Sequence, residues 1–290
     1  MSLNNFIPTV WSARLLTNLN NDLVFAQPSV INRDYEGEIR SAGDTVKINS
    51  IGRVTVGDYS KNNAIGNPAV LNDSQTTLQI TQSKFFNFMV DDVDRVQGNP
   101  SVMDAAMQEA AFAMNNTIDQ YIAAMHTQAA AANLYGTDGT PKVVGLGGTD
   151  LNAYNALVDV KTLLDEANVP NVGRWIIVPP WYEGLLLKDE RFVKFGTPPQ
   201  DARLLNGMIG RAAGFNVMTS NNINHTSGTK YKLMAGTNMA ITMAIQFTEI
   251  TAFRPEQFFS DAVKGLALYG AKVIRPDALV TFTASKGTLS

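Results

Sequence analysis

The chain has 290 residues, of which 45% are hydrophobic, and its 23 Lys and Arg against 26 Asp and Glu give a net charge of -3. This balance excludes a global basic field for nucleic acid, and the lack of cysteine excludes a disulfide scaffold, thiolate zinc sites and a cysteine nucleophile. Only 17% of the residues are charged, below the usual quarter, which suggests that partner subunits cover much of the surface.

The first segment, residues 1–40, is interpreted as an arm. Apolar residues between Trp11 and Leu23 have partial helical spacing, and Pro28 ends the pattern. The segment cannot bury this stripe within itself, so we expect it to lie on another surface. It lacks the regions of a signal peptide, and no window of the chain has the roughly 18 apolar residues of a membrane span. We therefore expect no membrane partner.

Residues 41–90 have the alternating pattern of strands. The stretches "GDTVKINSIGRVTVGDY" and "TTLQITQSKFFNFMV" place apolar residues among polar ones, and residues 57–75 between them are rich in Gly, Asn and Pro. This order predicts an extended hairpin with a polar tip. Because an isolated two-stranded hairpin is marginally stable in water, we expect it to rest on another molecule.

The strongest helical signal covers Ser101–Leu134. Ser101 and Asp104 fit the spacing of a capping box, apolar residues then recur every three or four positions, and Gly136 ends the pattern. At about 1.5 Å per residue such a helix is about 50 Å long. A helix of this length in a chain of this size is expected to be the backbone of the molecule.

Helices and strands alternate in residues 146–250, which indicates an α/β layer. A helix is predicted from about Asp150, a buried strand in "RWIIVPP", a helix in "PPWYEGLLLKDERF", and strands in "GFNVMTSNNI" and "YKLMAG". The stretch "TNMAITMAIQFTEI" fits a helix or a strand. The Gly-rich "GLGGTD" matches no phosphate-binding motif and is interpreted as a flexible connection.

The closing tract "AVKGLALYGAKVIRPDALVTFT" is predicted to be a strand followed by a turn at Arg275 to Asp277. Gly265 and Gly270 argue against a helix and would allow close backbone approach. A strand that is apolar on both faces belongs in a covered sheet. One face is expected to carry Val263, Ala267, Tyr269, Ala271 and Val273, and the other Leu266, Leu268 and Ile274, with Lys264 and Lys272.

The chain offers little catalytic chemistry. The HExxH, EF-hand and GxSxG motifs are absent. His126 is interpreted as a surface or interface histidine of the long helix. His225 lies in a polar loop with Ser220 and Ser227 nearby, but a triad also needs an ordering acid and an oxyanion site. We expect no cofactor and no metal site.

The order of arm, extended hairpin, long helix, α/β layer and terminal strands resembles the major capsid protein of tailed bacteriophages, whose fold is named after phage Hong Kong 97. The similarity covers nearly the whole chain. It is carried by the start, "IPTVWSARLLTNLNNDLVFAQPSVINRDYEGEIRSAGDTVKINSIG", and by the end, "FRPEQFFSDAVKGLALYGAKVIRPDALVTF".

The resemblance implies an α+β chain in four parts and a structural protein that is not an enzyme. Residues 1–40 would be the N-terminal arm and residues 41–90 the extended loop. Residues 91–145 and 251–290 would form the peripheral domain, with a spine helix over 101–134. Residues 146–250 would form the axial domain.

The resemblance also implies the partners. Copies of the chain would assemble through pentamers and hexamers into an icosahedral shell that encloses double-stranded DNA by non-specific contact. The shell would carry a portal protein. Because the hairpin begins only about forty residues in, we expect a separate scaffolding protein, or a removed segment if this is a mature form. The chain would be found in the virion capsid after assembly in the cytoplasm of a bacterial host. The expected interface residues are Trp11, Arg14, Lys47, Arg53, Asp58, Lys61, Arg203 and Arg211.

Two other functions remain open from the sequence. An encapsulin-like compartment would have the same fold and a protein cargo. An oligomeric α/β metabolic enzyme would use residues 146–250 and would need a pocket with a perturbed titratable group, for which His225 with Asp201 or Glu249 is the candidate set.

Overall fold

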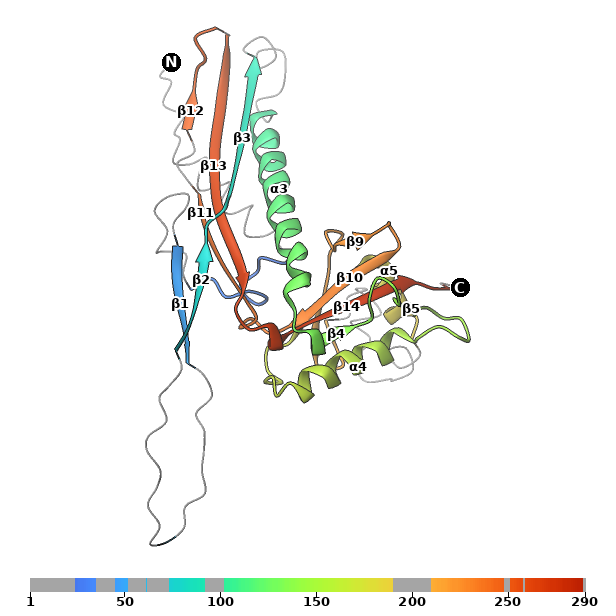
Figure 1. Cartoon of the computed structure of the whole chain (residues 1–290). Helices are drawn as coiled ribbons and strands as arrows, with labels where there is room; N and C mark the ends of the chain where they lie inside the picture. Colours follow the sequence, from blue (N-terminus) through green and yellow to red (C-terminus); the bar gives the residue numbers. More distant parts are fainter. Residues whose placement is uncertain are drawn as a thin grey trace.

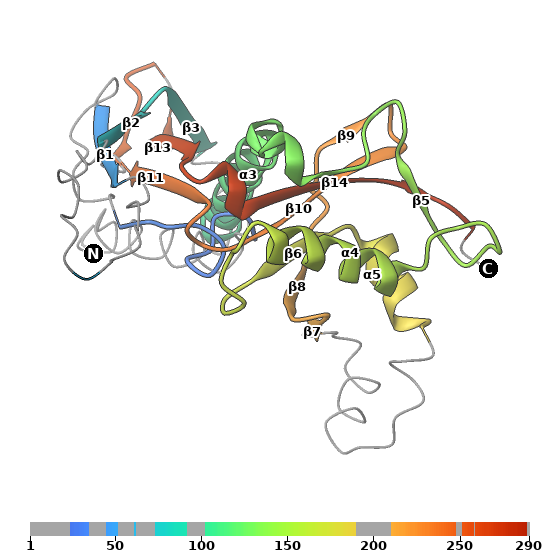
Figure 2. The same cartoon turned by 60° about the horizontal axis from the view of Figure 1, so that its bottom comes forward.

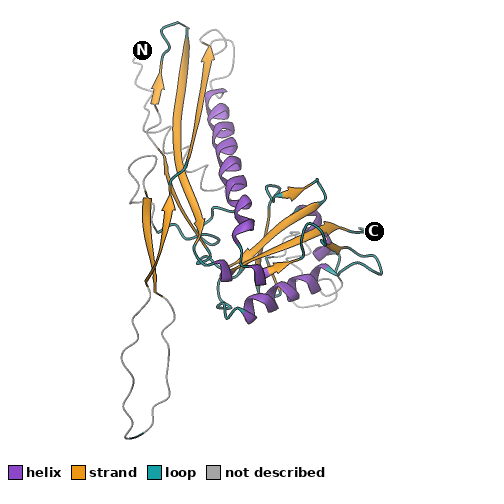
Figure 3. Ribbon diagram, in the orientation of Figure 1, coloured by secondary structure: helices purple, strands orange, loops and turns teal. Residues whose placement is uncertain are grey.

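The computed structural model describes residues 24–34, 45–51, 61, 73–91, 102–189, 210–247, 251–257 and 259–288. These residues form a mixed α+β structure with two parts (Figure 1, Figure 3). The first part, which we call the long limb, is narrow and contains the longest helix and the longest strands. The second part, the lobe, is more compact and lies at one end of the long limb.

The described helices and strands follow one another in the order expected from the sequence, with short additional strands. The helices are α3 (Val102–Ala123), α4 (Ala153–Glu166) and α5 (Pro180–Leu187). The strands are β1 (Thr45–Ile51), β2 (Asp73–Gln79), β3 (Gln82–Asp91), β4 (Leu134–Tyr135), β5 (Lys142–Val144), β6 (Trp175–Val178), β7 (Arg211–Ala212), β8 (Phe215–Thr219), β9 (His225–Thr226), β10 (Lys230–Gly236), β11 (Ile241–Phe247), β12 (Thr251–Phe253), β13 (Ser260–Val273) and β14 (Leu279–Lys286).

The sheet of the long limb is built around β13, a strand of 14 residues. On one side β13 pairs antiparallel with β3, from Ser260 opposite Asp91 to Tyr269 opposite Gln82. On its other side it pairs antiparallel with β11 and then β12. The stretch that fitted a helix or a strand is therefore the strand β11, since it completes this sheet. Helix α3 packs on one face, where the Tyr121 and Tyr269 rings meet edge to face at 5.3 Å.

Both faces of β13 are covered, as the alternation of the closing tract predicted. Val263, Ala267, Tyr269, Ala271 and Val273 belong to the main core. Leu268, on the opposite face, joins a smaller cluster with Ile48, Leu78, Ile80 and Ala244, against which Leu266 and Ile274 pack. The two faces therefore touch different parts of the chain: α3 on one side, and the base of the β1–β2 pair on the other (Figure 2).

The sheet of the lobe contains eight described strands in the order β4-β14-β10-β6-β8-β7, with β5 on β14 and β9 on β10. Every residue of β6 is buried, as predicted for "RWIIVPP". Asn152 caps α4 by accepting hydrogen bonds from the N–H groups of Tyr154 and Asn155, and α5 begins at Pro180. Strand β14 pairs with β10 along its length. The closing tract thus belongs to two sheets. After β13 in the long limb, the chain turns at Pro276 to Ala278 and enters the lobe as β14.

The long helix is shorter than the predicted Ser101–Leu134. It ends at Ala123 and tightens into a 3₁₀ turn over Ala124–Gln128. In a continued α-helix the Ala130 N–H would bond to the His126 carbonyl. Instead it donates to the Pro276 carbonyl at 3.2 Å, and the His126 carbonyl accepts from the Thr281 hydroxyl at 2.7 Å. Tertiary hydrogen bonds therefore replace the helical ones where the two parts of the molecule meet.

The "GLGGTD" turn is bonded to the end of the described chain. This corrects its interpretation as a flexible connection. The Asp150 carboxylate accepts hydrogen bonds from the Thr288 N–H at 2.8 Å and the Gly147 N–H at 3.2 Å. A Cβ at Gly145, Gly147 or Gly287 would overlap this carboxylate. The glycines are needed because the backbone passes this close to Asp150 on three sides.

Gly270 provides the close backbone approach predicted for the closing tract. A Cβ there would overlap the Gln79 carbonyl oxygen and lie 3.1 Å from the Ile80 Cα. The end of β2 thus rests directly on the backbone of β13, which is possible only without a side chain.

We expect Gly270→Ala to lower the free energy of unfolding by about 1–3 kcal/mol, the usual range for an overpacked site, because backbone must move to admit the methyl group. The control is Gly184→Ala in α5, where a Cβ would meet nothing within 4 Å. That change should be neutral or stabilising by about 0.5–1 kcal/mol. Urea unfolding of the isolated subunit measures both, and equal effects would contradict the role of Gly270.

Candidate functional site

The β1–β2 pair is the element that stands apart from both larger sheets. Its strands pair antiparallel over their whole length, from Thr45 opposite Gln79 to Ile51 opposite Asp73, and with no other described strand. Its base is held by Ile48 and Leu78 in the smaller cluster. The pair then points away from the long limb (Figure 1). Only one end of this hairpin stem is therefore supported by its own chain.

The hairpin stem and the long limb share one nearly continuous strand. β2 ends at Gln79 and β3 begins at Gln82, so only Ile80 and Thr81 separate the stretch that pairs with β1 from the stretch that pairs with β13. Lys272 of β13 donates from Nζ to the Thr77 carbonyl at 3.1 Å. These contacts fix the direction in which the stem leaves the long limb.

Residues 24–34 are anchored on α3 by a buried carboxylate. Asp119 is only 2% exposed, and it accepts hydrogen bonds from the N–H groups of Val24 at 2.9 Å, Phe25 at 3.2 Å and Ala26 at 3.3 Å. Asn32 adds backbone contacts to β11: its N–H donates to the Ile241 carbonyl, and its carbonyl accepts from the Met243 N–H. This segment is the described part of the predicted arm, and its Phe25, Val30 and Ile31 side chains lie in the main core of its own chain.

Large apolar side chains lie exposed along the long limb. Phe85 and Met89 on β3 are 77% and 57% exposed, and Phe259, beside the start of β13, is 83% exposed. Phe86 and Phe88, which alternate with the first two, pack instead against the main core. The sheet thus turns one apolar set toward α3 and leaves another open, which is typical of a contact surface.

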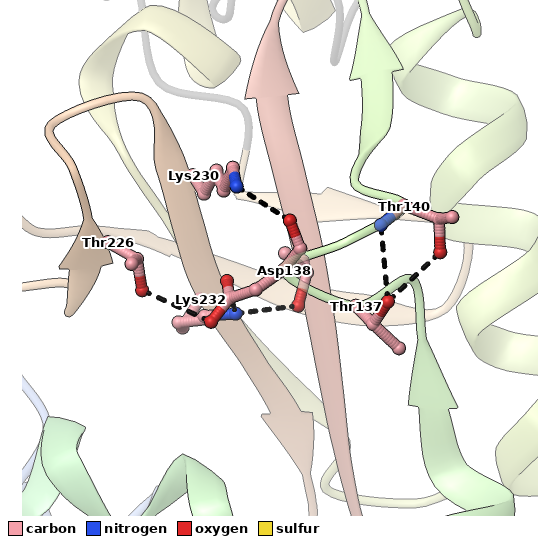
Figure 4. A network of polar contacts seen from close by, with 7 residues as sticks. Thr137, Asp138, Thr140, Thr226, Lys230 and Lys232 are labelled. Carbon is pink, nitrogen blue, oxygen red and sulfur yellow. Dashed lines mark hydrogen bonds and ion pairs between the residues drawn. The ribbon is translucent and has the colours of Figure 1, made fainter.

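A polar network holds the β4–β5 loop against β10 (Figure 4). The Asp138 carboxylate forms an ion pair with Lys232, which is 7% exposed, and Lys230 Nζ donates to the Asp138 carbonyl at 2.6 Å. The hydrogen bond from Lys232 lowers the pKa of the Asp138 carboxyl. Lys232 also donates to the Thr283 hydroxyl of β14 at 3.2 Å. All these contacts join residues of the network to one another, so we assign the network a structural role.

The expected interface residues fall mostly outside the described residues. This holds for Trp11, Arg14, Arg53, Asp58 and Arg203. The backbone of Lys47 lies in β1 opposite Thr77, and Lys61 is an exposed turn residue. Arg211 is exposed in β7, and its Nε donates to the Asn216 side-chain oxygen at 2.9 Å within its own chain. The described part of the chain brings none of these residues together, so their interface role stays a prediction.

The histidines show no catalytic arrangement in the described residues. His225 is exposed in β9 with its ring 5.8 Å from that of Tyr231, and no hydrogen bond joins it to Ser220 or Ser227. Asp201 and Glu249 lie outside the described residues. His126 is half-buried, and burial lowers its pKa. Its Nδ1 lies 3.0 Å from the Ala123 carbonyl oxygen.

The described residues hold no group of three or more His, Asp and Glu side chains that could bind a metal ion. None of their helices combines the length and the hydropathy that a membrane-crossing helix needs.

Sequence reasoning missed two buried polar residues, both within the predicted long helix, that connect distant segments. Asp119 lies on the core side of α3, and Asn133 donates from Nδ2 to the carbonyls of Asp277 at 2.6 Å and Leu279 at 3.1 Å. A polar residue among the apolar positions of a predicted helix was the available signal, since a buried polar group needs a partner.

Comparison with known proteins gives a family and a fold. Residues 75–282 match the model of a family described as phage capsid protein. No curated protein matches the chain in sequence. Among solved structures, a chain from Mycobacterium phage Che8 is 29% identical, with 90% of each chain covered and a TM-score of 0.66.

Two other solved structures have lower identity and show a shared fold. A chain from the capsid of cyanophage P-SCSP1u is 16% identical over 91% of this chain and 89% of that one, with a TM-score of 0.65. A chain from a virus-like particle of Pyrococcus furiosus is also 16% identical, over 93% of this chain and 96% of that one, with a TM-score of 0.53.

The anchor at Asp119 gives a pH-dependent prediction. Burial raises the pKa of the Asp119 carboxyl, although the three N–H groups act in the opposite direction. A carboxyl whose pKa is higher in the folded chain contributes most below the unfolded pKa of about 4, and this contribution falls as the pH rises through the folded pKa. Relative to Asp119→Asn, which cannot titrate, the wild type should therefore lose stability as the pH rises above about 4.

Urea unfolding of the subunit at several pH values tests this dependence. Asp119→Ala should cost at least about 2 kcal/mol, because three buried N–H groups lose their acceptor, and Asp119→Asn should cost less. Glu109→Gln, on an exposed part of the same helix, is the control and should change little. If the wild type instead gained stability relative to Asp119→Asn as the pH rose, the hydrogen bonds to the carboxylate would outweigh the effect of burial on its pKa.

Proposed function

Because this chain belongs to the phage capsid protein family, we propose that its copies assemble through hexamers and pentamers into an icosahedral shell around double-stranded DNA. The chain has the major capsid protein fold of tailed bacteriophages that the sequence predicted, and its role is structural, not enzymatic. The enzyme hypothesis for His225 is thereby set aside.

The hairpin stem is the observation that carries this proposal. A two-stranded sheet is marginally stable alone, and the described part of this one is supported by its own chain only at its base. The exposed Phe85 and Met89 on the same long limb offer apolar area to another molecule. Another copy of the chain can support the stem, and repeated contacts between neighbouring copies can build a closed shell.

The proposed parts of the chain follow the sequence prediction with changes at their boundaries. The arm is residues 1–40, and the extended loop ends near Ile80, because β3 belongs to the sheet of the long limb. The peripheral domain is the long limb, which takes in β11 as well as α3 and β13. The axial domain is the lobe, which takes in β14. These changes rest on the strand pairings.

The proposed interfaces and partners remain those of the resemblance. The arm, with Trp11 and Arg14, and the extended loop, with Lys61, would contact neighbouring copies. Arg203 and Arg211 would lie at contacts between axial domains. A separate scaffolding protein and a portal protein would take part in assembly in the bacterial cytoplasm, and the finished virion capsid would hold the DNA by non-specific contact.

An encapsulin-like compartment is the second candidate, and the likeness to the virus-like particle of Pyrococcus furiosus supports it. The two functions differ in what the shell contains. Particles purified from the native source should hold double-stranded DNA if the first is right, and a folded protein cargo with little DNA if the second is. Nuclease-protected DNA and protein mass spectrometry of the same particles decide between them.

Assembly is tested first by expressing the chain alone. We expect particles in the megadalton range by light scattering, and shells, tubes or five- and six-membered rings by negative-stain microscopy. If the chain stays small, the same measurement is repeated with the scaffolding protein added. A chain that remains a monomer or dimer in both conditions would contradict the proposed function.

Deletion of residues 57–72 tests the extended loop while sparing β1 and β2. The stem would keep its pairing from Thr45–Ile51 to Asp73–Gln79. We expect a folded subunit by circular dichroism that forms no stable shells. His225→Ala is the control, since His225 is exposed and should leave the shells intact. Normal particles from the deletion would count against the role given to the loop.

A further inference from the structure

Among the described residues, the outer edge of β3 has no partner strand. β3 has ten residues, and each of them faces a residue of β13 on one side. No described strand pairs with its other side. Helix α3 lies on one side of the sheet and the hairpin stem on the other (Figure 2). Within the described part of the chain, the backbone groups along this edge have no partner strand.

This edge lacks the features that protect strand edges from pairing. Natural edge strands are usually short, bulged, interrupted by proline or lined with charge. From Gln82 to Asp91 the sequence is "QSKFFNFMVD", which has no proline and no glycine, and its two charges are Lys84 and, at the end of the strand, Asp91. The pairing with β13 runs in unbroken register, so β3 has no bulge. The edge is suited to pair with another strand.

The side chains along this edge are complementary to themselves. If two β3 strands run antiparallel with Asn87 opposite Asn87, then Phe85 of each lies opposite Met89 of the other. These two are the exposed apolar residues of the strand, at 77% and 57%. On the other face Phe86 lies opposite Phe88. Directly opposed apolar residues are close neighbours, with Cβ atoms about 4.5–5.5 Å apart.

We propose that β3 pairs antiparallel with β3 of a second copy about a two-fold axis through Asn87, joining the two long-limb sheets into one. A two-fold contact uses the same patch on both copies, so it needs the self-complementarity described above. The proposal rests on the proposed function in that a shell supplies the second copy. In this arrangement the edge of β3 is the contact between two subunits. The Phe85–Met89 pairs exclude water from this contact.

The lack of cysteine in the chain makes the test direct. In the proposed pair the two Asn87 Cα atoms are about 4.5–5.5 Å apart, within the roughly 4.4–6.8 Å that a disulfide spans. Asn87→Cys should therefore form disulfide-linked dimers under mild oxidation. The matched control is Ser83→Cys, which is exposed on the same face. Its two copies would be separated by eight residues along the strands, about 27 Å, and should not link.

Non-reducing gel electrophoresis and light scattering of the same assembled samples give the outcomes. Dimers from Asn87→Cys and none from Ser83→Cys support the pairing. No dimers, or equal amounts from both variants, overturn it. Shells without the Asn87→Cys dimer would refute the pairing and leave the proposed function standing. If the Asn87→Cys dimer forms but no shells form, even with scaffolding protein, the pairing stands and the proposed function is refuted.

A second substitution tests the apolar pairs. Met89→Lys in the Asn87→Cys background places a charge opposite Phe85 of the second copy. Met89 is mostly exposed in the single chain, so the fold should be retained, as circular dichroism can verify. We expect the dimer yield to fall at least about tenfold, the effect of about 1.4 kcal/mol on an equilibrium. An unchanged yield would contradict the role of the pairs.

Discussion

The burial of both faces of β13 is the constraint on which the rest of the structure depends. One face lies in the core beneath α3, and the other supports the base of the hairpin stem. Its edges are used as well, by β3 on one side and by β11 and β12 on the other. A strand with so many neighbours leaves no room for catalytic polar groups, so the closing tract organises the subunit and carries no chemistry.

The join between the long limb and the lobe contains specific polar contacts beside the apolar core. The described chain crosses it between α3 and β4, between β10 and β11, and between β13 and β14. Asn133 bonds to two carbonyls at the crossing between β13 and β14, and the Gln128 side-chain oxygen accepts from the Val273 N–H at 3.3 Å. These bonds satisfy buried backbone groups, and they add direction to the apolar packing of the main core, which contains residues of both parts.

Elements with a local sequence pattern were predicted correctly. Features that depend on contacts between distant segments were not. The alternation in the closing tract gave both faces of β13 correctly, and Gly270 was correctly linked to a close approach. The length of α3 was wrong, because alanine-rich sequence continues past Ala123 while the hydrogen bonds that end the helix come from Pro276 and Thr281. The anchor at Asp119 was missed for the same reason, since its three donors lie over 90 residues away.

The near continuity of β2 and β3 has a mechanical consequence. A pull on the hairpin stem acts along the strand and reaches the ladder between β3 and β13 at the Gln82–Tyr269 end. The strands of this ladder run along the direction of the pull, so its hydrogen bonds are loaded in shear and share the force. A strand peeled sideways would lose them one at a time. In the proposed shell, the stem would therefore carry tension from one copy into the body of its neighbour.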